Sequence, residues 1–234
     1  MNIKLYFSLF VFVLWAAATI SGFALPLAPD DIDLSRILAS PLDGNLLGND
    51  DLGRPILDRL IVGAKVSFIV AFITTIISLS LGTVIGTLSG YFGGWVDRII
   101  VRFIDVFMAF PGILLAIALA GVMGAGIENV VIALSITGWV GYARLSRAQV
   151  MSVREREHVT AAIAMGVGDV AIMRRHVLPL VLAPLIVEAT FGFAGIIIGE
   201  AGLSFLGLGV QPPDASWGSM IRDGSQYLLV APHM

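Results

Sequence analysis

The sequence predicts an all-α protein of the polytopic helical membrane type. Hydrophobic residues make up 57% of its 234 residues and charged residues only 13%, whereas soluble domains average about 45–50% apolar and about 25% charged. Most charges lie between uncharged runs that reach the length of a membrane-spanning helix, about 20 residues. The absence of cysteine excludes disulfides, thiolate metal sites and cysteine nucleophiles.

The first predicted element, residues 1–29, is a transmembrane helix. Leu5–Pro29 is uncharged and follows Lys4. A cleavable signal peptide is the alternative interpretation, because small residues occur near Ser21–Ala24. The apolar core of a signal peptide is ordinarily about 7–15 residues long, which is shorter than this run. A retained first span is therefore preferred.

Residues 30–65 are predicted to form an acidic extracytoplasmic loop with a short helix. Its aspartates are Asp30, Asp31, Asp33, Asp43, Asp50, Asp51 and Asp58. The adjacent pair Asp50 and Asp51 suggests a metal site only weakly, because a hard cation needs several spaced oxygen ligands. A solvated turn or a cap is the favoured interpretation, and no metal site is predicted.

Residues 66–232 are predicted to form a transmembrane domain with four further spans. Their apolar segments are Val66–Val96, Val106–Ile127, Asn129–Ala143 and Val177–Val210. Pro111 is expected to kink the second of these, and the third has only 15 residues, with Trp139 and Tyr142 at its interface. About five spans are expected in all. A last apolar segment begins at Tyr227.

Small residues recur at helical spacing within these spans. Gly82, Gly86 and Gly90 are four residues apart and therefore share one helix face, where small residues let helices approach closely in lipid. Packing within the chain is preferred over a face that binds a partner. No longer internal repeat is present, so an inverted-repeat secondary transporter gains no support.

Residues 144–179 form a polar, basic loop between two apolar segments. Val159, Ala162, Ile163 and Gly166 recur at helical spacing, which predicts a short helix with an apolar stripe. Gly166 is expected to end that helix, and Asp169 is a candidate N-cap for a second one. Two short amphipathic helices at the membrane surface would form a docking site for a soluble partner.

The bias of lysine and arginine sets the orientation of the spans. With the N-terminus in the cytoplasm, nine of the fourteen basic residues fall inside and five outside. The loop 144–179 then faces the cytoplasm and the acidic loop faces outwards. The basic residues are interleaved with apolar spans rather than gathered in a solvated patch, which argues against nucleic-acid binding.

The segment TAAIAMGVGDVAIMRRHVLP resembles the EAA loop of bacterial ABC importer permeases. Thr160, Ala161 and Ala162 occupy the first triplet, and Gly166 follows after three residues. The remaining motif positions are His176, Leu178 and Pro179. Leu47–Ser67, Phe103–Pro111 and Glu200–Met220 are similar to segments of dipeptide, oligopeptide and nickel permeases, so the resemblance extends over nearly all of residues 46–232.

The resemblance implies an inner-membrane subunit of a binding-protein-dependent importer that moves small peptides or a related small solute. Its expected partners are a second homologous permease, cytoplasmic ATPase subunits and an extracytoplasmic substrate-binding protein. Its transmembrane helices would also contact membrane lipid. No cofactor is expected on this chain, because it has no GxxxxGK[ST] motif and ATP would be used by the partner. Gly166 would permit a tight turn and Pro179 would stop the second helix.

Two departures from the family pattern stand out. The family's glutamate is Thr160 here, and Glu157 is the nearest carboxylate that could replace it. Family members also continue through a sixth span, whereas this chain stops at Met234. A truncated, non-transporting permease fragment is therefore the alternative, and a secondary transporter is a weaker one.

Glu188 and Glu200 lie in otherwise apolar sequence, where an ionisable group suggests a lined pathway or a satisfied contact between helices. We expect a structural hydrogen bond at Glu200. Glu188 is the better candidate for a contact with a peptide amine or a metal cation. Gly202–Ser204 lacks the second glycine of a nucleophile elbow, so no catalytic residue is predicted.

Overall fold

The computed structural model describes residues 3–43 and 45–234, and these residues form helices and loops without a β-strand. The all-α prediction is therefore confirmed for this part of the chain. Met1 and Asn2, which belong to the predicted first helix, lie outside the described residues, as does Gly44.

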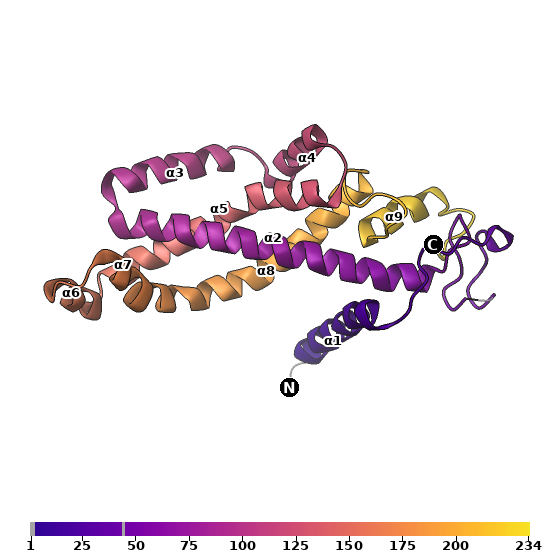
Figure 1. The fold of residues 1–234 in the computed structure, drawn as a ribbon, viewed down its shortest axis with the longest axis horizontal. Coiled ribbons are helices and arrows are strands. Elements are labelled where there is room, and N and C mark those ends of the chain that lie inside the picture. The colour runs from indigo at the N-terminus through magenta and orange to yellow at the C-terminus, as the bar shows by residue number, and fades with distance from the viewer. Residues whose placement is uncertain (1–2, 44) are drawn as a thin grey trace. The chain divides into compact units, whose positions relative to one another are not determined.

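The long helices are α1 (Ile3–Ala24), α2 (Ile56–Phe92), α3 (Gly94–Met108), α4 (Gly112–Met123), α5 (Ile127–Arg154) and α8 (Leu178–Phe205). The short elements are the 3₁₀ turn η1 (Leu34–Arg36), α6 (Glu157–Ala164), α7 (Asp169–Ile172), the π-helical turn η2 (Met173–Val177) and α9 (Trp217–Gln226). Figure 1 shows their order along the chain.

The chain forms two compact units. Unit 1 contains residues 1–71, 120–130 and 197–234, and unit 2 contains residues 72–119 and 131–196. The division falls within α2, α4, α5 and α8, so each of these helices contributes residues to both units.

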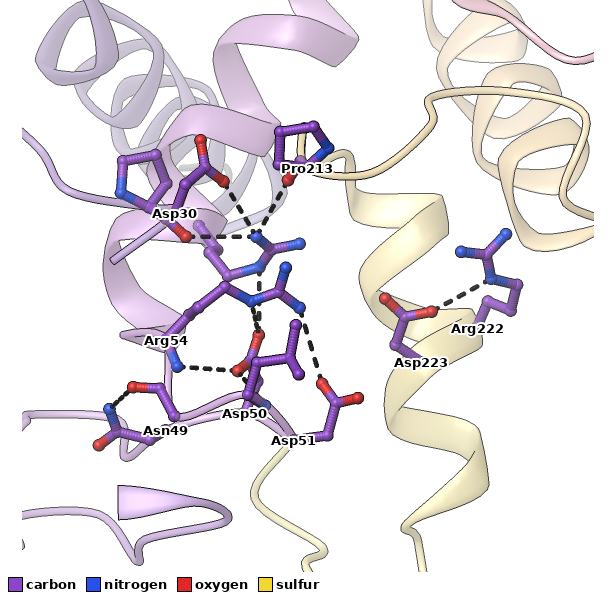
Figure 2. A network of polar contacts seen from close by, with 12 residues as sticks. Asp30, Asn49, Asp50, Asp51, Arg54, Pro213, Arg222 and Asp223 are labelled. Atoms are coloured by element: carbon purple, nitrogen blue, oxygen red, sulfur yellow. Dashed lines mark hydrogen bonds and ion pairs between the residues drawn. The ribbon is translucent and has the colours of Figure 1, made fainter. Parts of the chain in front are cut away.

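Unit 1 contains a network of buried ion pairs (Figure 2). The guanidinium of Arg54 donates to Asp50 Oδ2 at 2.7 Å, and Arg59 Nε lies 3.4 Å from the same oxygen. Asp50 Oδ1 accepts backbone N–H groups of Leu52 and Arg54 at 2.9 and 2.8 Å. These bonds agree with a turn at Asp50, but the side chain is buried and not solvated as expected. Among the described residues, no group of three or more His, Cys, Asp or Glu could hold a metal ion.

In unit 2, the three spaced glycines of α2 lie against α5. A Cβ at Gly82 would lie 2.5 Å from the Trp139 carbonyl oxygen, and one at Gly86 would collide with the Ala143 carbonyl oxygen. A Cβ at Gly90 would lie 2.7 Å from the Arg147 carbonyl oxygen. Such contacts require glycine, because the backbone atoms of the neighbouring helix cannot move aside cheaply.

The start of α2 and the course of the predicted span 106–127 differ from the sequence-based expectation. α2 begins at Ile56, inside the predicted loop 30–65, because Asp58 and Arg59 find polar partners there and do not end the helix. The predicted span 106–127 is instead divided into α3 and α4, bent by 82°. Pro111 causes this break, because a proline disfavours the helical conformation of the residue before it.

By length and composition, two helices among the described residues could cross a membrane, Ile56–Phe92 and Asp169–Phe205, and the bent pair α3–α4 would add a third. α5 is 28 residues long, well beyond the predicted 15-residue span. It carries four charged residues within these 28 positions, whereas α2 carries three in 37 and α8 carries two in 28, so α5 is the more polar helix. The total of five spans remains a prediction.

Candidate coupling site

The residues of the predicted docking loop fold into α6, α7 and η2, at the end of unit 2 where α2 gives way to α3 (Figure 1). Arg156 is the N-cap of α6, in an extended conformation. Val159 and Ala162 are fully buried, as the apolar stripe predicted, but Ile163 is half exposed. The stripe is therefore narrower than expected, since Ile163 and Gly166, two of its four predicted residues, are exposed.

The buried side of the loop belongs to the main hydrophobic cluster of unit 2. This cluster contains Tyr142, Val150, Val153, Val159, Ala162, Ile172, Val177, Val181 and Leu185. Its members come from α5, α6, α7, η2 and α8, so the two short helices are anchored in the same core as two long ones. A body packed in this way is expected to move as one piece.

Gly166 ends α6 as predicted from the sequence. Its φ is +78°, its N–H donates to the Ile163 carbonyl at 2.9 Å, and the Val167 N–H donates to the Ala162 carbonyl at 3.1 Å. This pair of bonds is a Schellman motif, which satisfies the last carbonyl groups of a helix. A β-branched residue at this φ is a genuine conformational outlier.

Asp169 is not the N-cap of α7, contrary to the sequence-based expectation. Gly168 occupies that position, without a side-chain hydrogen bond, and Asp169 is the first residue of the helix. Its Oδ1 instead accepts a hydrogen bond from the Tyr91 hydroxyl at 2.9 Å. The carboxylate is turned towards the end of α2 and does not cap its own helix.

Pro179 does not stop the second short helix, which corrects another expectation. α7 continues through η2 into α8, where Pro179 is the second residue. The Leu178 N–H donates to the Met173 carbonyl, one residue further back than in an α-helix. This π-helical turn accommodates the proline, because a local change of hydrogen-bond spacing displaces the carbonyl groups that its ring would contact.

The outer side of the loop presents apolar and basic side chains together. Ile163, Met165 and Val170 are 52%, 76% and 74% exposed. Arg174 and Arg175 line an open hollow of about 570 Å³ beside Val170. Large apolar side chains gathered at a surface and rimmed by polar ones mark sites of protein interaction.

The other predicted docking residues divide between surface and interior. Glu157, Thr160, Ala161 and Pro179 are exposed, whereas His176 and Leu178 are half-buried. The Thr160 hydroxyl donates to the Glu157 carbonyl at 2.9 Å. Thr160 therefore makes a bond within its own helix, and Glu157 presents the nearest exposed carboxylate.

Sequence reasoning missed the polar contacts that join α5 to α2 and α3. Arg154 donates to the carbonyl oxygens of Gly90 and Tyr91 at 3.1 and 2.9 Å. Arg147 pairs with Asp97 through two bonds of 2.5 and 2.7 Å. The sequence could not reveal these pairs, because no local pattern indicates a partner 50 or more residues away.

The two glutamates of α8 have different surroundings. In unit 1, Glu200 is 1% exposed and accepts hydrogen bonds from Ser67 and Ser204 at 2.9 and 2.7 Å. In unit 2, Glu188 is exposed, one helical turn before Gly192, and a Cβ at Gly192 would collide with the Tyr142 hydroxyl. The fold therefore encloses Glu200 and leaves Glu188 accessible.

Comparisons with known proteins place these features in a wider group. Residues 82–232 match the family described as binding-protein-dependent transport system inner membrane component. The chain is 38% identical over 227 residues to the glutathione transport system permease protein GsiD of Pectobacterium atrosepticum, covering 97% of this chain and 75% of that relative. It is 42% identical over 198 residues to the dipeptide transport system permease protein DppC of Alkalihalophilus pseudofirmus, covering 85% and 65%.

A solved structure supports the fold independently. The MetNI methionine ABC transporter, in an inward-facing conformation, matches with a TM-score of 0.63 at 18% identity, over 75% of this chain and 82% of that one. At this level of identity the likeness concerns the arrangement of helices and not the solute.

Proposed function

Because the chain belongs to the family of binding-protein-dependent transport system inner membrane components, we propose that it carries a small peptide across the bacterial cytoplasmic membrane. The relatives named above are permeases for glutathione and for dipeptides, and both solutes are short peptides. This shared chemistry favours a peptide over nickel or another small solute. The energy comes from ATP hydrolysed by a separate subunit.

The exposed side of α6 and α7 is the proposed contact for that ATPase subunit. Ile163, Met165 and Val170 supply apolar area, while Glu157, Arg174 and Arg175 supply charge at its edge. The observation that supports the proposal most directly is that α6 and α7, which present this surface, share one buried cluster with α5 and α8. A push on the surface therefore displaces two long helices as a rigid body, a recognised route of switching.

Glu188 is proposed to lie on the path of the solute. An exposed carboxylate in an apolar helix is too costly to face lipid and instead faces protein or a water-filled cavity. A peptide's amino group would provide the matching positive charge. Glu200, which two hydroxyl groups already satisfy, is assigned a structural role.

The proposed assembly contains a second permease, ATPase subunits and an extracytoplasmic binding protein, with the N-terminus of this chain in the cytoplasm. Reconstitution of the full partner set in lipid vesicles tests the proposal. We expect uptake of a labelled dipeptide or glutathione that requires ATP and the binding protein. Uptake that persists without ATP would instead favour a secondary transporter.

A further inference from the structure

The docking loop is joined to three long helices, although the chain connects it to only two. Its backbone leads directly to α5 and α8, whereas α2 is distant in sequence. The link to α2 is the hydrogen bond from the Tyr91 hydroxyl to Asp169 Oδ1, 2.9 Å long and spanning 78 residues. It joins the last turn of α2 to the first residue of α7.

The surroundings of Tyr91 fix the position of this bond. The tyrosine packs against the buried cluster to which Val159, Ala162 and Ile172 of the loop belong. Its own ring meets that of Phe92 edge to face, with centroids 5.3 Å apart. These contacts restrict the Tyr91 ring and therefore fix the position of its hydroxyl group. A hydrogen bond from a fixed hydroxyl group can transmit a displacement of Asp169 to α2.

A second contact holds the end of α2 to the end of α5. Arg154, the last residue of α5, donates to the carbonyl oxygens of Gly90 and Tyr91. These carbonyl groups belong to the last turn of α2, where helices lack internal donors and favour positive charge. The last turn of α2 is therefore bound on one side by Arg154 and on the other by Asp169.

We infer that Tyr91 is a positioning residue for coupling: through Asp169, it passes the displacement of α6 and α7 to α2. This inference rests on the proposed function of the loop. Without the bond, the loop would still move α5 and α8 through the backbone, and α2 would follow α5 through the bonds from Arg154 and through the packing of α2 on α5. The Tyr91–Asp169 bond adds a direct link from α7 to α2.

The test uses Tyr91→Phe, Asp169→Ala and the double variant, each reconstituted with the partner subunits. The quantity to be measured is the amount of peptide transported per ATP hydrolysed. We expect each single variant to lower this ratio about fivefold, the factor that corresponds to one hydrogen bond of ordinary strength. The double variant should be no worse than either single one, because both remove the same bond. Tyr6→Phe, at an exposed tyrosine of α1, is the matched control and should leave the ratio unchanged.

A wild-type ratio in Tyr91→Phe would overturn the inference and leave the proposed function intact. A parallel loss of hydrolysis and transport would also overturn it, because that result indicates failed docking or folding. If the wild-type assembly shows no ATP-dependent uptake, the proposed function fails and the inference fails with it.

A crosslink provides a second measurement, because the chain has no cysteine of its own. Tyr91→Cys and Asp169→Cys together can be bridged by a short bifunctional maleimide. We expect the bridged permease to transport peptide at the rate of the unbridged double variant or faster, since the two positions move together. Transport that stops on bridging would show that the positions separate during the cycle, and would overturn the inference.

Discussion

At the scale of single residues, Glu200 is a carboxyl group enclosed in unit 1 with two hydroxyl groups as its partners. Bulk solvent does not reach it, since Glu200 is 1% exposed and Ser67 and Ser204 are fully buried. Ser204 also accepts a hydrogen bond from the Val210 N–H at 3.3 Å. The three side chains therefore form a small polar network that ties α2, α8 and the segment after α8 together.

We predict that Glu200→Leu lowers the stability of the permease more than Glu200→Gln does. Leucine leaves the two serine hydroxyl groups without their acceptor, at a cost of about 1–3 kcal/mol for a buried group, whereas glutamine retains one acceptor oxygen. Thermal unfolding of the purified protein in detergent measures the difference. Equal melting temperatures for the two variants would contradict the structural role assigned to Glu200.

The packing of α2 against α5 requires a residue without a side chain at Gly86. Gly86→Ala places a methyl group against the Ala143 carbonyl oxygen and 2.7 Å from Ser146 Cβ, so α2 and α5 must move apart. We expect a loss of about 1–3 kcal/mol in the free energy of unfolding, as for overpacking in general.

The matched control is Gly195→Ala in α8, where an added Cβ meets nothing within 4 Å. Both substitutions gain the same helix propensity, about 1 kcal/mol for alanine over glycine, so the difference between them isolates the steric term. Unfolding of the isolated subunit in detergent gives the comparison. If both variants gain stability equally, the close contact of α2 with α5 is not what the glycine provides.

At the scale of elements, the turn between α6 and α7 determines how rigidly the docking surface is held. Gly166→Val forces a β-branched residue to φ +78°, a strain of about 1–3 kcal/mol, and the Schellman bonds at the end of α6 are expected to break. We predict that ATP hydrolysis continues while transport falls, with normal insertion into the membrane. Hydrolysis and uptake measured on the same vesicles test this.

Gly168→Val provides the control for that experiment. Gly168 lies two residues further on, with φ −69° and ψ 150°, a conformation that valine adopts readily. A Cβ added at Gly168 would meet nothing within 4 Å. A loss of coupling in Gly168→Val equal to that in Gly166→Val would show that bulk in the loop matters and the turn geometry does not.

The same loop shows which features of an element can be read from sequence. The end of α6 follows from Gly166 and the inward side of α6 from Val159 and Ala162, because both depend on neighbours within one or two turns. The role of Asp169 could not be read in this way, since its partner Tyr91 is 78 residues distant. Pro179 was misjudged because the π-helical turn that accommodates it has no recognisable sequence pattern.

At the scale of the whole molecule, the distribution of charge and apolar residues was enough to predict an all-α membrane protein, whereas its family followed from the motif in Thr160–Pro179. The angle of 82° between α3 and α4 could not be predicted from the sequence. Pro111 indicates a kink, but its size depends on what the two helices pack against. The start of α2 was not predictable either. The charged residues of 30–65 indicated a loop, but Arg59 pairs with Asp50 and lies within the helix.

The orientation of the molecule yields the final prediction. Nine basic residues on one side and five on the other favour a cytoplasmic N-terminus and a cytoplasmic docking loop. Because the chain lacks cysteine, Asp43→Cys and Thr160→Cys each introduce a single thiol. In intact cells whose outer membrane has been made permeable, we expect a membrane-impermeant maleimide to label the thiol at position 43.

The thiol at position 160 should be labelled only after the inner membrane is opened, since ATP and its hydrolysing subunit are in the cytoplasm. Both side chains are exposed in this chain, and labelling of position 160 once the inner membrane is open shows that a bound partner does not cover it. Labelling of position 160 from outside would show that the topology is the reverse of the predicted one. The surface formed by Ile163, Met165 and Val170 could then not contact a cytoplasmic ATPase.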